Sequence, residues 1–496
     1  GRETQREDGD DTGQPLQLTE EDAAEAQLLE QELGEIDDDF DPMDDIDDLQ
    51  SLFAPVSTRF PTGAKSTEDP LKDLLVNTYE SFVNAGPLFN KNVAMVRSYS
   101  NLTKEEQVGS DEAVAERLIS HMQDNLLYIY DSVPAKTREI SKQWYEGANR
   151  IMQRVADRHG LTLAQASAVA ANLSPQKDWY QNASLAERVI DIYHENKTDA
   201  FDDQMKATAE VIYFHKTVGK DARISNRKML DIIQGKSLQD LIDEGVPSNI
   251  LGMWIRTYDQ TYNSPKYRLV SPDGKFLDYA VNEDGKTSSR VGWGSLGEIG
   301  KAVTAVMNTD MDILSKSLGG ANKVRNFYNN IFDPSSDKGF VTIDTHAVAA
   351  ALLRPLGGKA AEVATNFGTQ KGSSSSKVTG HRGTYSLYEE AYRRAAQERG
   401  VLAREMQSIT WEAVRGLFTA PYKKQKQNVA FVQGVWNQYN EGKLSLNEAR
   451  KKIDGHSGGI QRPDWERSNF TVPDEVSGTS YEKVVPDSGI SRPESG

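Results

Sequence analysis

The chain contains no cysteine, which excludes disulfides, cysteine nucleophiles and metal sites built from thiolates. It has no apolar run near the roughly 20 residues that a membrane helix requires, so we expect no membrane contact. The first residues, Gly-Arg-Glu-Thr, lack the basic and apolar regions of a signal peptide, and we expect a cytoplasmic location. The missing initiator Met indicates a processed product or a fragment of a longer protein. No motif indicates a cofactor or a metal, and we predict neither.

Apolar residues are also scarce, at 37% of the chain with a mean hydropathy of -0.62. The net charge of -17 is concentrated near the N-terminus, because residues 1–50 hold 20 Asp and Glu against two Arg. Like charges at this density repel, so residues 1–70 are predicted to be a disordered acidic tail. The tail is either a solubilising spacer or a segment that binds a protein partner or covers a basic DNA-binding surface. A second disordered tail is predicted for residues 461–496, which are rich in Pro, Ser and Gly.

Helical periodicity dominates between the tails, and we predict one mostly α domain over residues 71–460. Gly160 is expected to end a helix, and Thr162 to cap the next one. That first helix should bury one face made of residues at helical spacing: Trp144, Ala148, Ile151 and Val155.

A stretch over residues 256–295 departs from this pattern. Three β-prone runs, 267–270, 276–281 and 289–293, are separated by the turn sequences Ser-Pro-Asp-Gly and Asn-Glu-Asp-Gly. The pattern predicts a small three-stranded β-meander inserted into the helical domain.

Two further segments carry chemistry. In the first, an apolar helix ends at Leu173, Pro175 forces a turn, and Gln176 is placed at its tip. An uncharged amide there can donate and accept hydrogen bonds, as a group inserted into a DNA gap must. In the second, residues 313–353, two helical runs flank Gly319-Gly320, whose backbone could face a phosphate. A β-prone run then leads to Asp344 at the start of an apolar helix.

These segments resemble the helix-hairpin-helix DNA glycosylases. Leu173-Ser-Pro-Gln176, with Asn182, looks like the family turn that sends Gln into the DNA gap. Val341-Thr-Ile-Asp-Thr-His346 resembles the Val-Asp-Thr-His stretch of the endonuclease III branch, whose Asp is catalytic. The segments follow the family's order over roughly residues 150–360. The hairpin reads Gly-Gly-Ala-Asn instead of Gly-x-Gly, and the cluster-binding cysteines of endonuclease III are absent.

The resemblance implies a two-lobed glycosylase-like fold and cleavage of the N-glycosidic bond of a flipped base, either ordinary or modified. Asp344 would be the catalytic carboxylate, and Lys323 lies near the Lys that forms a Schiff base in members with lyase activity. DNA would be bound by six residues: Gln176, Asn182, Gly319, Gly320, Arg325 and Arg382.

Other interpretations of the same residues stay open. Asp344 at a helix start is most often an N-cap, and Lys323 a surface or phosphate-contacting lysine. As alternatives to a glycosylase, the chain is a non-catalytic DNA-binding or virion-associated protein on the same scaffold, or a transferase that modifies a DNA base. A similarity to phage or mobile-element proteins would allow virion association and delivery into a host cell.

Overall fold

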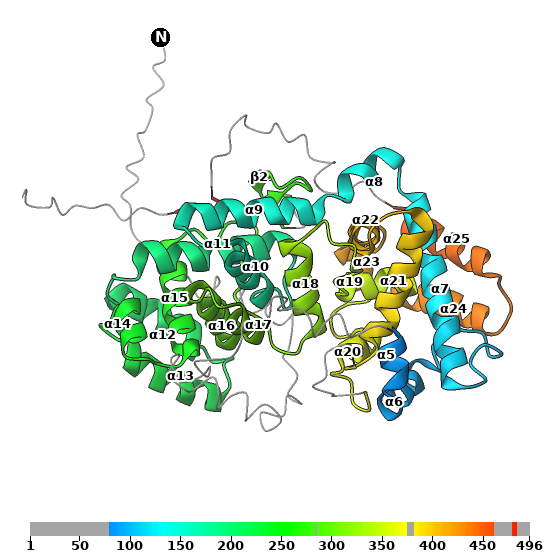
Figure 1. Ribbon diagram of the computed structural model, residues 1–496, viewed down its shortest axis with the longest axis horizontal. Coiled ribbons are helices and arrows are strands. Elements are labelled where there is room, and N and C mark those ends of the chain that lie inside the picture. Colours follow the sequence, from blue (N-terminus) through cyan, green and yellow to red (C-terminus); the bar gives the residue numbers. More distant parts are fainter. Residues whose placement is uncertain (1–78, 283–284, 374–380, 461–478, 484–496) are drawn as a thin grey trace, which may run out of the picture.

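The computed structural model describes residues 79–282, 285–373, 381–460 and 479–483 (Figure 1). The two predicted tails, residues 1–70 and most of residues 461–496, lie outside the described residues. Most of the described chain is helical and the sheet has only two strands, which confirms a mostly α fold. None of its helices combines the length and apolarity needed to cross a bilayer.

The helices gather around two hydrophobic cores, which we call the first lobe and the second lobe (Figure 1). The first lobe contains the following elements: α9 (Trp144–His159), α10 (Leu163–Asn172), α11 (Trp179–Asn196), α12 (Asp203–Phe214), α13 (Lys220–Ile233), α14 (Leu238–Asp243), α15 (Ser248–Tyr262), β1 (Arg268–Val270), β2 (Phe276–Tyr279), α16 (Leu296–Met307), α17 (Met311–Leu318) and α18 (Asn322–Phe332).

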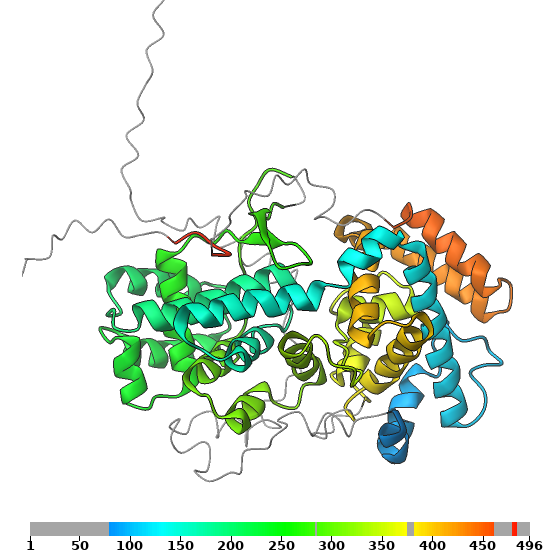
Figure 2. The ribbon, with the colours of Figure 1, turned by 45° about the horizontal axis from the view of Figure 1, so that its top comes forward.

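The second lobe combines helices from both ends of the described chain. They are α5 (Tyr79–Asn84), α6 (Pro87–Val96), α7 (Asp111–Ser132), α8 (Ala135–Ser141), α19 (Thr345–Leu352), α20 (Ala361–Phe367), α21 (Tyr385–Arg399), α22 (Ala403–Leu417), α23 (Ala420–Lys424), α24 (Lys426–Asn440) and α25 (Leu446–Ser457). In the rotated view, α24 and α25 lie at the far edge of this lobe from the first lobe (Figure 2).

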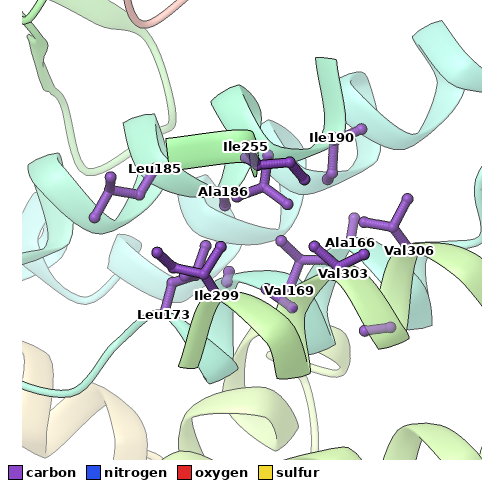
Figure 3. Close-up of a cluster of buried hydrophobic side chains, with 14 of the residues drawn as sticks. Ala166, Val169, Leu173, Leu185, Ala186, Ile190, Ile255, Ile299, Val303 and Val306 are labelled. Carbon is purple, nitrogen blue, oxygen red and sulfur yellow. The ribbon is translucent and has the colours of Figure 1, made fainter. Parts of the chain in front are cut away.

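Helix α10 is the centre of the first lobe, as its apolar sequence predicts. Every one of its residues from Ala164 to Asn172 is buried, and it contacts α9, α11, α16, α17 and α18. Small Ala side chains let these helices approach closely, while larger side chains such as Val169 and Ile299 fill the space between them (Figure 3). The segment that follows α10 is therefore held by a rigid support.

The predicted boundaries around α9 and α10 are confirmed. Gly160 ends α9 with φ 70°, a conformation that glycine adopts without steric cost. Thr162 caps α10 by accepting a hydrogen bond from the Gln165 backbone N–H, and the Gln165 side chain reciprocates. Local sequence chemistry is enough to set these helix ends.

The predicted meander is only partly present. Strands β1 and β2 pair antiparallel, but residues 288–290 form only isolated bridges with the segments next to these strands, Lys266 with Arg290 and Val281 with Ser288. The insertion also begins later than residue 256, because α15 continues to Tyr262. The prediction of a third strand is therefore wrong, because the β-prone residues at 289–293 make too few ladder hydrogen bonds to form a strand.

Candidate active site

The candidate site lies where the two lobes meet. Trp411 comes from α22 of the second lobe, yet its side chain packs into the core of the first. The first turn of α9 is joined to α22 by the Trp144 indole, which donates to the Glu412 carboxylate at 2.7 Å. Residues from both lobes are therefore held side by side at this junction.

Asp344 is the N-cap of α19, as its position at a helix start predicts. Its Oδ1 accepts from the Ala347 backbone N–H at 2.8 Å, and its Oδ2 accepts from the Trp411 indole at 3.1 Å. The Asp344 side chain is half-buried, and the protein around it excludes enough water to raise the pKa of its carboxyl. Lys323 and the two hydrogen bonds oppose this rise. Both oxygens are thus oriented by partners that stabilise the charged form.

Lys323 lies in the first turn of α18 and joins the site to the turn after α10. Its Nζ donates to the Ser174 carbonyl at 2.8 Å. Desolvation lowers the pKa of Lys323, while the carboxylates of Asp344 and Glu298 raise it in opposition. A lowered pKa increases the share of neutral amine, which is the nucleophilic form. The structure therefore brings Lys323, Asp344 and the 173–176 turn together.

The remaining side chains around Asp344 are mostly basic. Arg415 places its guanidinium 4.5 Å from the centre of the Trp411 ring. Burial lowers the pKa of Lys423, and the nearby Asp344 carboxylate partly offsets this change. The pKa of His346 is well below its usual value because of burial and the cations Lys423 and Arg415. His346 is therefore neutral at pH 7. The local field favours an anionic ligand such as a phosphate.

Gln176 occupies the tip of the turn and has an unusual backbone conformation. Its φ is 55°, in the left-handed region that non-glycine residues rarely adopt, and its side chain is exposed. Such strain is held in place by the surrounding structure, here the buried helix α10 and the Ser174–Lys323 hydrogen bond. The turn therefore holds an exposed amide at its tip.

Two of the expected DNA contacts, Asn182 and Arg325, have other roles in the fold. Asn182 is buried, and its Nδ2 donates to the Ala170 carbonyl at 2.8 Å, which fixes α11 against α10. Arg325 is buried as well, and it donates to the carbonyls of Gly319 and Ser315 within the hairpin. Neither side chain is presented to a ligand. Arg382 is half-buried, and its neighbour His381 forms a hydrogen bond with Ser81 of α5.

The glycine joint makes a sharp turn between α17 and α18. Gly319 ends α17 with φ 67°, and Gly320 is exposed just before α18. Arg325 braces this joint from inside, so its backbone conformation is supported by a side chain. The exposed turn leads directly into the helix that carries Lys323.

Sequence reasoning did not place Trp411, Arg415 and Lys423 beside Asp344, and it did not identify the Ser174 carbonyl as the partner of Lys323. Trp411 is 8% exposed and packs in the core, and its indole N–H also donates to Asp344 Oδ2. The spacing of Trp411 and Arg415 on one helix face was the only available signal, and it does not identify residue 344 as the partner. Most other basic residues of α21 and α22 are used in ion pairs, as Arg394 is with Glu116 and Arg404 with Glu146.

Comparison with known proteins identifies one family. Residues 110–226 and 280–418 match the model of a family of unknown function, DUF7178, and this range includes Lys323, Asp344 and Trp411. No curated protein matches the chain, and no solved structure matches it either. The matched residues make up just over half of the 496 residues, and the chain therefore belongs to the DUF7178 family.

Proposed function

We propose that the chain is a DNA glycosylase-like enzyme of the helix-hairpin-helix type, which cleaves the bond between a flipped base and its sugar. The observation that carries the proposal is the joint placement of Asp344, Lys323 and the Gln176 turn at the junction of the two lobes. These elements are far apart in the sequence. Their meeting at one site is what a wedge, a carboxylate and an amine acting on a single nucleotide require.

Asp344 has the properties of the electrostatic group. Cleavage of an N-glycosidic bond develops positive charge on the sugar, and a fixed carboxylate near C1′ stabilises it. In hydrolysis, water forms a bond to C1′ and gives a proton to Asp344, while the base leaves with the electron pair and takes up a proton. The two hydrogen bonds to Asp344 prevent its reorientation during this step.

Lys323 offers a second route. In its neutral form, Nζ would replace water, form a bond to C1′ as the C1′–base bond breaks, and lose its proton to Asp344. Opening of the sugar ring then gives an imine, from which the 3′-phosphate is lost by elimination. The lowered pKa of Lys323 supports this route because it reduces the cost of deprotonation.

The DNA backbone would meet the positive field of the site. Arg415 and Lys423 stand beside Asp344, and the exposed Gly320 lies just before the start of α18, where a helix N-terminus favours a phosphate. Gln176 would fill the gap left by the flipped base. Asn182 and Arg325 are not part of this proposal, because both are buried structural groups.

Base release from a panel of duplexes carrying modified pyrimidines and purines tests the proposal. At least one duplex should yield alkali-labile abasic sites, and Asp344→Asn should reduce the yield by at least ~100-fold. Asparagine is also a good N-cap, so the start of α19 should be kept. The exposed Asp337 provides a matched control, and Asp337→Asn should cut like the wild type.

The lysine route has its own assay. Borohydride should trap a covalent complex with wild-type protein and abasic DNA, and Lys323→Gln should remove it while retaining a donor for the Ser174 carbonyl. Trapping at full yield by Lys323→Gln would contradict the role of Lys323. Salt-dependent DNA binding by Asp344→Asn and the wild type alike, with no base release from any duplex, would favour a DNA-binding protein without catalysis.

A further inference from the structure

The segment Thr479–Lys483 binds to the first lobe although it follows α25 of the second lobe in the sequence. The Ser264 backbone N–H donates to the Glu482 carbonyl at 3.1 Å, and the Arg268 N–H donates to the Ser480 carbonyl at 2.9 Å. Asn263 and Lys483 form an antiparallel bridge. The segment therefore adds to the edge of the inserted β region as an extended peptide, a common mode of peptide recognition. The expected tail at 461–496 is wrong for these five residues.

Tyr481 is the apolar anchor of this contact. It is 2% exposed, and its ring lies 4.3 Å from the guanidinium carbon of Arg188. Arg188 is itself fully buried and pairs with both oxygens of Asp259, so the aromatic ring covers a fixed cation. The Tyr481 hydroxyl donates to Asp191 Oδ2 at 2.9 Å. These contacts select a ring that carries a hydroxyl.

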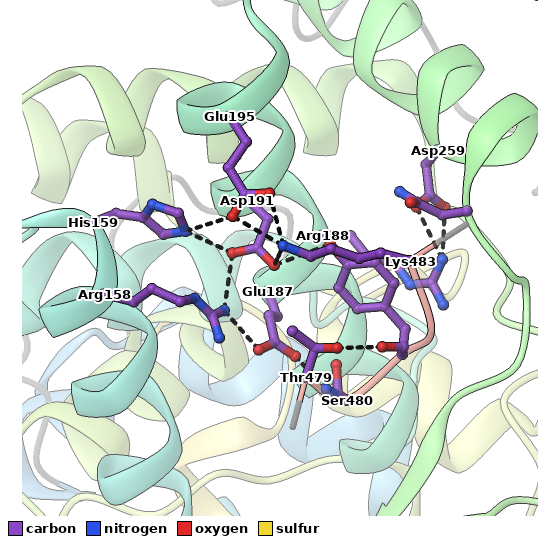
Figure 4. A network of polar contacts seen from close by, with 12 residues as sticks. Arg158, His159, Glu187, Arg188, Asp191, Glu195, Asp259, Thr479, Ser480 and Lys483 are labelled. Carbon is purple, nitrogen blue, oxygen red and sulfur yellow. Dashed lines mark hydrogen bonds and ion pairs between the residues drawn. The ribbon is translucent and has the colours of Figure 1, made fainter. Parts of the chain in front are cut away.

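Lys483 supplies the charge that complements this surface. Its Nζ lies 2.7 Å from a Glu195 oxygen and 3.2 Å from Asp191 Oδ2 (Figure 4). Glu187 and Asp191 are almost completely buried and are also paired with Arg158. Burial favours a higher pKa for Asp191, but His159, Arg158 and Lys483 together hold the pKa below its usual value. Asp191 is therefore kept charged by its partners, whereas burial raises the pKa of the neighbouring Glu187.

The same pocket contains the residues that, among those the structure describes, could hold a metal ion. Ligand atoms of His159, Asp191 and Glu195 lie within 4.8 Å of one another. The Lys483 ammonium already contacts both carboxylates, and Arg158 contacts one of them. A lysine-bearing peptide explains this geometry without a metal.

We propose that the first lobe has a binding site for an extended peptide carrying Tyr and Lys two residues apart, and that residues 479–483 fill it as a reversible clasp between the lobes. The clasp joins the lobes because α25 belongs to the core of the second lobe through Ala449 and Ile453. Within one chain, the short connection gives the segment a high effective concentration, so a free peptide competes poorly. This inference is independent of the glycosylase proposal.

A peptide with the sequence of residues 478–485, labelled with a fluorophore, tests the site. The full-length double variant Tyr481→Ala/Lys483→Glu should bind it, whereas wild-type protein should bind at least ~10-fold more weakly because its own segment occupies the site. The Glu482 side chain is exposed, so a peptide with Glu482→Gln should bind like the parent. A peptide with Lys483→Glu should not bind. Equal binding of that peptide, or no binding of the parent peptide, would overturn the proposal.

Hydrogen exchange gives a second measurement on the intact chain. The amides of Ser264 and Arg268 should exchange at least ~3-fold faster in Lys483→Glu than in the wild type, because the carbonyls they donate to leave. Added parent peptide should restore their protection. Unchanged exchange rates would overturn the clasp even if the double variant did not fold. If the Ser264 and Arg268 amides of the wild type were protected only when the protein forms a dimer, residues 479–483 of one copy would bind the other copy. That result would also overturn the proposal of a clasp within one chain.

Discussion

Glu389 gives the protein a pH dependence that can be worked out from its surroundings. It lies on α21 of the second lobe and is 4% exposed. Its Oε1 accepts from Asn326 of α18 at 3.3 Å, and its nearest cation, Arg393, is 3.5 Å away. Burial raises its pKa from 4.5 to about 7, and Arg393 and Asn326 only partly oppose that rise. A neutral carboxyl is therefore favoured in the folded state.

The sign of the effect follows from this rise. The contribution of neutral Glu389 to the free energy of unfolding is fully present below pH 4.5 and is lost as the pH rises to about 7. The reason is that Glu389 loses its proton more easily in the unfolded chain than in the folded protein. At 1.36 kcal/mol per pKa unit, the loss is roughly 3 kcal/mol. Glu389→Gln cannot ionise and should avoid it. The variant should match the wild type at pH 4.5 and unfold with a free energy roughly 3 kcal/mol higher at pH 8.

Urea unfolding at a series of pH values measures this difference. The neighbouring Glu390, which pairs with Arg394 nearer the surface, provides the control. Glu390→Gln should change the free energy of unfolding by less than about 1 kcal/mol at either pH. A stability difference between Glu389→Gln and the wild type that stays constant from pH 4.5 to pH 8 would refute the reasoning.

Three other changes should have measurable effects. Burial lowers the pKa of His121 to about 3, and its Nε2 accepts hydrogen bonds from two Asn amides. The contribution of neutral His121 to the free energy of unfolding should be fully present above pH 6.5 and should be lost as the pH falls toward 3. In urea unfolding, His121→Gln should make this loss shallower, and an equally steep loss would contradict the reasoning. Gln176→Gly should raise the melting temperature by relieving left-handed backbone, worth ~1 kcal/mol, and still weaken DNA binding; a lower melting temperature would count against strain. Trp411→Phe should raise the pKa of Asp344 by removing a donor and move the acidic limb of any pH–rate profile to higher pH, whereas an unmoved limb would exclude this role.

The fold class and several boundaries could be predicted from local chemistry. Gly160, Thr162 and Asp344 act on their own helix ends, and each acts as its position predicts. Their partners lie within a few residues, so a linear sequence contains the whole interaction. The small insertion was predicted in outline for the same reason, because β1 and β2 are joined by a tight turn.

The errors concern contacts between distant parts of the chain. Asn182 is polar and was placed at DNA, but the carbonyl that it satisfies belongs to Ala170 in another helix. Trp411 and Asp344 are 67 residues apart, and no pattern in either segment indicates that they form a hydrogen bond. Tyr481 lies among Ser, Gly and Pro residues, where composition predicts disorder. Its pocket is made by Arg188 and Asp191, which the local sequence cannot reveal.

The way in which Asp344 is held links any chemistry at this position to the placement of an entire helix. One of its oxygens is aimed by the first turn of α19, and the other by a ring from α22. Lengthening or shortening the connection between α18 and α19 would leave the N-cap and its indole partner intact, since α19 and α22 pack in the same core, but would shift the carboxylate relative to Lys323 on α18. Family members that differ in length over residues 333–343 should therefore keep a well-formed α19 and differ in reactivity.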